Sequence, residues 1–408
     1  MSGQRTAGPR EGASSGLVSR RAFLQRSLLL AAGGGTALRW AGETWATGAA
    51  GGVSATRARA DAKVAIVPCR SYGPEVRAAL ARSFDLLGGI GSLVKDKTVT
   101  VKVNLTGTNF AQFLGRPVGE TYMTHYTTVL ALTGLLCEAG ARRVRLVEST
   151  QSRSELAGTL ALADWDVKAL EALGRIEFEN TRNLGVSRSY AHLPVPTGGY
   201  MFSSLDLNHA YADTDVMVSL AKLKNHITAG VTLSMKNLFG LTPNSLYGTE
   251  AGREDATEGR FPLHDPHGFE KLKLPGLKAG INSADPGWRV PRITADICTA
   301  RPIHLAIIDG ITSMSGGEGP WCQDVGPLKF TNPGVLIAGL NPVSTDAVAT
   351  AVMGYPNPRA PRGVPPFEMC DNHLVLAEQA GAGVADLGQI EVRGLTLATA
   401  RYPYPRAS

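Results

Sequence analysis

The stretch that decides the fold is residues 216–240, VMVSLAKLKNHITAGVTLSMKNLFG. Its apolar start predicts a buried strand over residues 216–220. Two lysines, an asparagine and a histidine follow at once, and a helical pattern over residues 229–239 then brings in a third lysine. We therefore expect a junction between a strand and a helix at which several positive charges gather.

The three lysines of this junction, Lys222, Lys224 and Lys236, fall within fifteen residues. Ammonium groups this close repel one another unless a negative charge lies between them. Ligands of α/β proteins bind at the ends of strands, so the pattern predicts a small anionic ligand. Lys224, His226 and Lys236 are the catalytic candidates, and Lys222 and Asn237 are binding candidates. The alternative interpretation is three solvated surface lysines.

The first sixty residues have the features of an export signal. Arg20-Arg21 precedes a weakly apolar segment, residues 27–38, which is too short and too rich in glycine to span a bilayer. Paired arginines before such a segment indicate a twin-arginine signal. A small-x-small site at residues 58–60 places the mature start near Asp61, with residues 46–50 as an alternative cut. We expect the twin-arginine export machinery as a partner and a periplasmic or extracellular location.

The net positive charge of the chain comes from this predicted signal. The whole sequence has 41 basic and 35 acidic residues, and removing the eight basic and two acidic residues of positions 1–60 leaves 33 of each. The mature chain is therefore neutral, which argues against nucleic acid as a partner. The lysine cluster is a local feature and not part of a basic face.

Two further classes of site are not supported. No stretch after residue 61 is apolar for long enough to cross a membrane. The five cysteines are widely spaced without a C-x-x-C, so there is no iron–sulfur motif and no zinc-finger pattern. The sequence does not identify a cofactor, although a divalent metal is one candidate.

Strand-like runs alternate with helical patterns along the mature chain. This order predicts an α/β fold, in which a mainly parallel sheet has helices on both faces. Residues 61–408 are expected to form a single domain. Residues 242–290 show little periodicity and are expected to be a loop insertion or a lid. The predicted strands are residues 63–68, 98–103, 143–148, 176–179, 200–205, 216–220, 303–308, 334–340 and 389–392.

Polar residues lie at or just after the ends of several predicted strands. If the strands are parallel neighbours, these side chains line one crevice. Lys102 and Asn104 are binding candidates at the end of one strand, Glu148 and Ser149 lie at the end of the next, and Asp309 follows another. Asn341 follows a third, and Asp346 opens the next predicted helix.

Three further groups are candidate ligand contacts. Gly317 and Gly319 belong to a glycine-rich loop whose backbone N–H groups could approach an anion, although a surface loop is the alternative. Asp309, Glu318 and Asp346 could together hold a hard cation if folding brings them close. The pair His264 and His267 has His-x-x-His spacing, which can chelate a divalent metal, against the alternative of ordinary exposed histidines.

The chain resembles the family called domain of unknown function 362 over roughly residues 63–394. The likeness is carried by motifs containing Lys102 and Asn104, by KLKNH at residues 222–226, by VTLSMKNLFG at residues 231–240, and by later motifs around Asp309, Glu318 and Asp346. Some members carry ferredoxin-like cysteine motifs, which this chain lacks. The resemblance implies no settled activity. A distant likeness to the nickel-pincer lactate racemases is a fold-level analogy only.

These observations predict an exported α/β protein that binds an anionic small molecule or cofactor at strand ends, with metal-assisted catalysis as one form of this activity. The alternative function is a non-catalytic binding or maturation partner of an exported redox enzyme.

Overall fold

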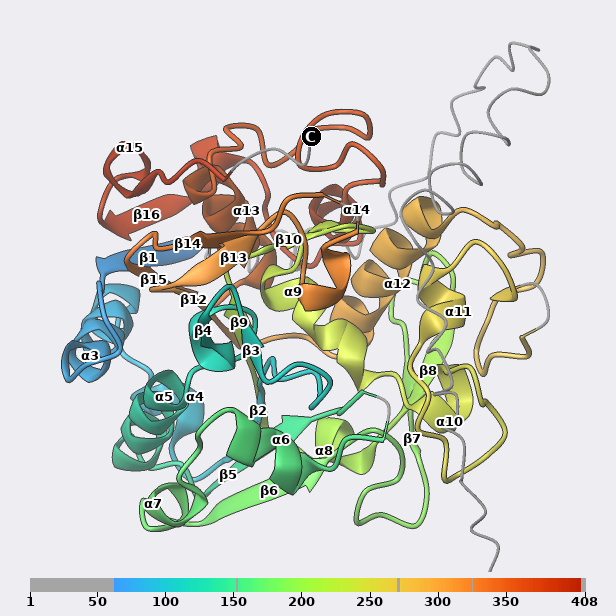
Figure 1. Cartoon of the computed structure of the whole chain (residues 1–408), viewed down its shortest axis with the longest axis horizontal. Helices are drawn as coiled ribbons and strands as arrows, with labels where there is room; N and C mark the ends of the chain where they lie inside the picture. Colours follow the sequence, from blue (N-terminus) through green and yellow to red (C-terminus); the bar gives the residue numbers. More distant parts are fainter. Residues whose placement is uncertain (1–61, 152, 270–271, 325, 405–408) are drawn as a thin grey trace, which may run out of the picture. The chain divides into compact units, whose positions relative to one another are not determined.

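The computed structural model describes residues 62–404 apart from residues 152, 270–271 and 325, and its central element is a sheet of eight strands (Figure 1). The strand order is β16-β1-β15-β12-β9-β2-β5-β6. Among these strands, β15 alone runs antiparallel to its neighbours, and the other pairs are parallel. The expected α/β class with a mainly parallel sheet is confirmed. The predicted signal peptide lies outside the described residues.

The strands of this sheet are β1 (Lys63–Pro68), β2 (Thr98–Lys102), β5 (Arg143–Glu148), β6 (Ile176–Asn180), β9 (Val216–Lys222), β12 (Leu305–Gly310), β15 (Val335–Gly339) and β16 (Glu391–Gly394). Their bounds agree with most of the predicted strands to within two or three residues. The prediction for residues 200–205 differs, because the strand there is β8 (Ser204–Leu207), which pairs with β7 (Ala191–Pro194) outside the main sheet.

Helices cover both faces of the sheet, because the strands alternate their apolar side chains between two hydrophobic cores. Val218 and Leu220 of β9 belong to the core shared with α3 and α5, whereas Met217 belongs to the core shared with α9, α12, α13 and α14. A strand buried on both faces is mostly apolar, and in β9 only Ser219 and the terminal Lys222 are polar. These helices are α3 (Glu75–Leu87), α5 (Tyr126–Glu138), α9 (Leu233–Asn237), α12 (Pro286–Ala300), α13 (Pro342–Val352) and α14 (His373–Gln379).

Shorter elements complete the described chain. The remaining helices are α4 (Gly91–Val94), α6 (Leu156–Leu162), α7 (Val167–Glu171), α8 (His209–Ala212), α10 (Asn244–Tyr247), α11 (Phe261–His264) and α15 (Leu397–Ala400), with 3-10 turns at Val118–Glu120, Leu238–Leu241, Pro320–Cys322 and Leu387–Gln389. Two-stranded pairs are β3 (Gln112–Phe113) with β4 (Arg116–Pro117), β10 (Asn225–His226) with β11 (Gly230–Val231), and β13 (Ser313–Ser315) with β14 (Lys329–Thr331). None of the helices in the described part of the chain is both long enough and apolar enough to cross a bilayer.

The long irregular section is shorter than expected. It contains the two four-residue helices α10 and α11 and ends at Asp285, whose side chain accepts a hydrogen bond from Gly287 N and caps α12. The predicted helix over residues 229–239 is also wrong at its start. Gly230 has a φ of +75° in the β10–β11 hairpin, so the helix α9 begins only at Leu233.

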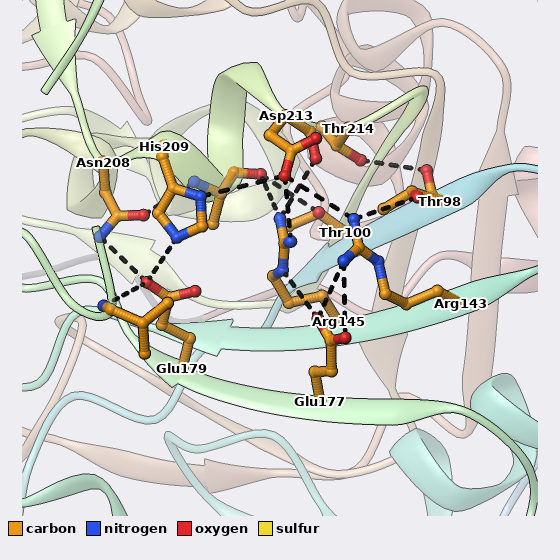
Figure 2. A network of polar contacts seen from close by, with 12 residues as sticks. Thr98, Thr100, Arg143, Arg145, Glu177, Glu179, Asn208, His209, Asp213 and Thr214 are labelled. Atoms are coloured by element: carbon orange, nitrogen blue, oxygen red, sulfur yellow. Dashed lines mark hydrogen bonds and ion pairs between the residues drawn. The ribbon is translucent and has the colours of Figure 1, made fainter. Parts of the chain in front are cut away.

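A network of charged side chains links β2 and β5 to β6 and α8 (Figure 2). The guanidinium of Arg145 is 3% exposed and lies 3.4 Å from the Glu177 carboxylate and 3.5 Å from the Asp213 carboxylate. Arg143 contacts the same two acids, and its Nη2 also donates to the hydroxyl of Thr98. A carboxylate thus accompanies the deeply buried charge of Arg145, as is usual for buried cations.

Candidate functional site

The C-terminal ends of four adjacent parallel strands meet at one edge of the sheet. Lys102 ends β2, Glu148 ends β5, Lys222 ends β9, and Asp309 is the penultimate residue of β12. The register pairs Asp309 directly with Lys222. All four side chains are buried. The structure therefore brings together Lys102, Glu148, Lys222 and Asp309, which were all expected at a shared edge.

Lys222 and Asp309 form a buried ion pair with no free hydrogen-bonding capacity on the lysine. Lys222 Nζ lies 3.4 Å from Asp309 Oδ2 and donates to the Tyr72 hydroxyl at 2.7 Å and to two backbone carbonyl oxygens, of Gly119 and Thr312. Asp309 also accepts from Tyr72 and from Thr128. Burial lowers the pKa of Lys222, and Asp309 opposes this shift. An ammonium has three protons, so this lysine serves the fold and has none left for a ligand.

Lys102 is neutralised in the same way. Its Nζ lies 2.5 Å from Glu148 Oε1 and donates to the carbonyl of Val103. The second carboxylate oxygen of Glu148 accepts from the backbone N–H of Leu105. Burial lowers the pKa of Lys102, and Glu148 acts in the opposite direction. Lys102 is therefore part of a structural pair beside the site.

Lys224 extends beyond the end of β9 and joins two distant loops. Its Nζ donates to the backbone carbonyls of Tyr122 and Glu318, each at 2.8 Å. Within the described residues no carboxylate oxygen lies within 4.0 Å of this nitrogen. The pKa of Lys224 is lowered to about 7, chiefly by burial, with Glu318 partly opposing the shift and Lys222 adding to it. One N–H of this buried ammonium remains available.

Lys236 has no acidic partner among the described residues. It lies on α9, is 7% exposed, and places its Nζ 3.3 Å from His264 Nε2 and 4.0 Å from the centre of the Phe239 ring. Burial lowers the pKa of Lys236 to about 7, with Glu318 acting against the shift and Arg260, Lys224 and Lys102 adding to it. A neutral ring nitrogen and an aromatic face compensate a buried charge only in part.

Two imidazoles lie beside Lys236. His264 Nδ1 is 3.1 Å from the carbonyl of Arg260, so it carries the proton and Nε2 is the acceptor that faces Lys236. His226 Nδ1 accepts from Thr228 N at 3.2 Å, and its ring lies 6.0 Å from that of His264 at an angle of 20°. Burial, followed by the charge of Lys236, lowers the pKa of both histidines well below the usual range. Both rings are therefore neutral at physiological pH.

Arg260 is a site residue that the sequence reasoning missed. It immediately precedes α11, is 8% exposed, and donates from Nε to Thr242 and from Nη2 to the Ser149 hydroxyl and the Gly240 carbonyl. No carboxylate of the described chain lies within 4.0 Å of its guanidinium. Burial lowers the pKa of Arg260 to about 10. In the sequence it is one charge among many in an aperiodic section, so no local signal distinguished it.

The glycine-rich loop brings Glu318 into the site. Glu318 Oε2 accepts from Ile227 N at 3.1 Å and lies 3.9 Å from His226 Nδ1, and Oε1 accepts from Trp321 Nε1 at 3.2 Å. A Cβ on Gly319 would lie 2.3 Å from the Trp321 ring, and one on Gly317 would lie 2.4 Å from Cys322 Cβ. Close packing therefore explains both glycines, and the anion-binding role predicted for Gly317 and Gly319 stays a prediction.

The three carboxylates expected to share a cation lie in separate surroundings. Asp346 accepts from the backbone N–H groups of Ser234 and Met235, each at 2.9 Å, and from the Ser234 hydroxyl, so it caps α9. Burial raises the pKa of Asp346 to about 7. Asp309 is held by Lys222. In the described part of the chain, no three His, Cys, Asp or Glu side chains are arranged to hold a metal ion.

The expected placement of Asn341 and Asp346 at the shared strand edge needs correction. Since β15 is antiparallel to β12, α13 starts at the opposite edge of the sheet from Lys222 and Asp309. Asn341 caps α13 there by accepting from Ser344 N.

The remaining candidates divide between the site and its surroundings. His267 is exposed and its backbone N–H bonds to Asp265, so the His-x-x-His pair is split, with His264 alone beside Lys236. Asn237 Nδ2 donates to the carbonyl of Lys102 at 3.2 Å. The side-chain oxygens of Asn237 and Asn104 are buried without a hydrogen-bond partner among the described residues.

Comparisons with known proteins find a curated relative and several remote structures, of which two follow. The relative is the thylakoid-associated protein sll1697 of Synechocystis sp., 30% identical over 200 residues, which are 47% of this chain. The chain spans 55% of the length of that relative. The lactate racemase apoprotein of Thermoanaerobacterium thermosaccharolyticum shows 12% identity and a TM-score of 0.34, covering 62% of this chain and 50% of that one. A protein of Thermotoga maritima shows 11% identity and a TM-score of 0.31, covering 59% and 50%.

Structural similarity this remote carries no argument about ligand or activity. The family match is more extensive. The model of the family described as domain of unknown function (DUF362) matches residues 99–351, which include the site residues from Lys102 to Glu318. The chain belongs to the DUF362 family.

Proposed function

We propose that the strand-end site binds a small anionic molecule, with Lys236 as its main contact and Lys224 and His226 beside it. The single observation behind this proposal is the burial of Lys236 to 7% exposure without a carboxylate within 4.0 Å among the described residues. Lysine is rarely buried to this extent unless it is paired. An anion would supply the missing partner.

The other lysines support this assignment by contrast. Lys222 and Lys102 have Asp309 and Glu148 as partners, so their charges are already balanced. Leaving an ammonium buried and unbalanced costs several kcal/mol, and the lysine avoids part of this cost by losing its proton. A bound anion removes that cost and stabilises the folded chain by mass action.

The same geometry suits proton transfer to a bound ligand. Lys236 and Lys224 have pKa values of about 7, so each exchanges a proton near neutral pH. The neutral His226 and His264 can donate or accept hydrogen bonds. We therefore propose that any catalysis here is general acid–base chemistry by Lys236 and Lys224. Metal-assisted catalysis has less support, because Asp309 is paired with Lys222 and Asp346 accepts from the backbone of α9.

Thermal unfolding of the purified chain in the presence of phosphate, sulfate and small carboxylates tests the proposal. At constant ionic strength, at least one anion should raise the midpoint, and Lys236→Met should abolish the rise. The matched control is Lys168→Met, since Lys168 is also in the last turn of a five-residue helix, α7, but is exposed. No rise with any anion, or an unchanged rise in Lys236→Met, would refute the site.

We also propose export through the twin-arginine route, on the basis of Arg20 and Arg21 before the apolar segment of residues 27–38. Replacing both arginines by lysine should leave the chain unprocessed on the cytoplasmic side of the membrane. Processing and export that continue unchanged in this variant would contradict the proposal.

A further inference from the structure

The deeply buried cations of this chain include two contrasting groups. Lys102, Lys222 and Arg145 are each at most 3% exposed and each has a carboxylate oxygen within 3.5 Å, as Figure 2 shows for Arg145. Lys224, Lys236 and Arg260 are 1%, 7% and 8% exposed, and no carboxylate of the described residues lies within 4.0 Å of them.

The second group forms one cluster, which we call the unpaired cations (Lys224, Lys236 and Arg260). Lys236 Nζ contacts His264, whose Nδ1 bonds to the Arg260 carbonyl. The ring of His226 stacks near that of His264 and lies 3.9 Å from Glu318, whose carbonyl accepts from Lys224. A chain of contacts thus connects all three cations across β9, α9 and the section before α11.

The charges of this cluster do not balance. When all three are protonated, the unpaired cations carry three positive charges, and the nearby histidines are neutral. Glu318 is the acid that acts on both Lys224 and Lys236 most strongly, and it contributes one negative charge. Two positive charges are left, in a region where solvent screening is weak.

We propose that the ligand of this site is a dianion, of the phosphate or dicarboxylate type, and that Arg260 is one of its specificity-determining residues. This inference rests on the proposed function. A monoanion would leave one buried charge unbalanced, whereas a dianion neutralises the cluster. Arg260 acts chiefly through its charge, because its Nε and Nη2 already donate to Thr242, Ser149 and Gly240.

Arg260 also holds the long section against the strand ends. Its guanidinium bridges Ser149, which follows β5, and Gly240, which follows α9. The backbone of the same residue fixes the tautomer of His264. Both the charge of the site and the placement of His264 therefore depend on a long section whose helices, α10 and α11, are only four residues each.

Isothermal titration with sulfate, inorganic phosphate, malonate, formate and acetate at constant ionic strength tests the inference. We expect the dianions to bind at least about tenfold more tightly than the monoanions. Comparing the affinities for sulfate and phosphate with that for malonate then distinguishes a tetrahedral ligand from a dicarboxylate. Equal affinities for dianions and monoanions would overturn the inference while leaving the anion site intact, whereas no binding of any anion would refute the proposed function itself.

Variants of Arg260 provide the second half of the test. Arg260→Gln should reduce the preference for dianions about tenfold, and Arg260→Lys should keep most of it, because lysine restores the charge. The circular dichroism spectrum and the unfolding midpoint report whether each variant folds. If Arg260→Gln does not fold, Arg260→Lys remains informative, since loss of the preference in this charge-retaining variant would contradict a role through charge. An unchanged preference in folded Arg260→Gln would overturn the assignment.

Discussion

Lys236 Nζ and His264 Nε2 lie 3.3 Å apart, although the two residues come from different helices and neither has an acid as its nearest partner. The imidazole Nδ1–H is directed at the Arg260 carbonyl, so the ring presents a lone pair to the lysine. The ammonium form of Lys236 donates strongly to this lone pair, whereas the neutral amine is a much weaker donor. The site is therefore sensitive to pH and to any anion that fixes the protonation state of Lys236.

The first prediction concerns stability against pH without a ligand. The pKa of Lys236 is lowered from 10.5 to about 7, so above pH 7 the unfolded chain binds a proton that the folded chain does not. The free energy of unfolding should therefore rise from about pH 7 to about pH 9 by roughly 1.4 kcal/mol per pH unit for this lysine, and the gain should be lost as the pH falls through 7. Urea unfolding of the wild type and of Lys236→Met measures the difference in slope.

Other titrating groups set the useful range and the control for this measurement. Buried thiols and tyrosines have raised pKa values and oppose the trend at higher pH. The groups whose charge acts on Lys236 and the two neighbouring histidines are Glu318, Arg260, Arg289, Lys224, Lys102 and His373. Saturating sulfate should flatten the slope, because a bound anion stabilises the ammonium. Identical slopes in the wild type and in Lys236→Met would show that Lys236 is not the titrating group.

The second prediction concerns Asp346. Asp346→Ala should destabilise the chain by about 2–4 kcal/mol, since two buried backbone N–H groups of α9 lose their acceptor. Asp346→Asn should cost less, because the amide oxygen still accepts. Denaturant unfolding with and without a metal chelator is the measurement. A loss of stability that appears only when metal is present would support the cation-binding role instead.

The third prediction concerns the ion pair of Lys222 and Asp309. Removing one partner, as in Lys222→Met, should cost about 3–5 kcal/mol, because it leaves a buried charge uncompensated. The double variant Lys222→Met with Asp309→Leu should recover part of this loss. The control is Arg116→Ala, which removes an exposed pair with Glu120 and should change stability by less than about 1 kcal/mol. Additive effects of the two single substitutions in a double-mutant cycle would argue against coupling.

The fourth prediction is that one substitution, Glu318→Gln, increases the affinity for sulfate while it lowers the stability of the chain. Glu318→Gln removes the negative charge beside Lys224 and Lys236, so sulfate should bind about tenfold more tightly. The variant should also be less stable by about 1–2 kcal/mol, because the amide has a single acceptor oxygen for the two donors Ile227 N and Trp321 Nε1, which now bond to separate carboxylate oxygens. Titration calorimetry and urea unfolding measure the two effects. Weaker sulfate binding in this variant would place the anion away from Glu318.

Local sequence patterns were sufficient for most strands of the sheet. The apolar run that forms β5 was predicted over the residues that the structure shows, Arg143–Glu148, and β9 was predicted to within two residues. The hairpin of β10 and β11 was missed, because its turn depends on the positive φ of Gly230 within a stretch whose apolar spacing also suits a helix. Strand direction was also beyond local reasoning, since an apolar run such as β15 has the same pattern in either orientation.

For the candidate site, the sequence by itself placed Lys222, Lys224 and Lys236 close together, because proximity along the chain at a strand end forces proximity in space. Only the tertiary structure decided that Lys222 is balanced while Lys224 and Lys236 are not, since the one carboxylate partner, Asp309 of Lys222, comes from a remote segment. It also separated His264 from His267 and brought in Arg260. The physical reason is that burial and pairing of a charge depend on long-range contacts, which residue type and spacing do not encode.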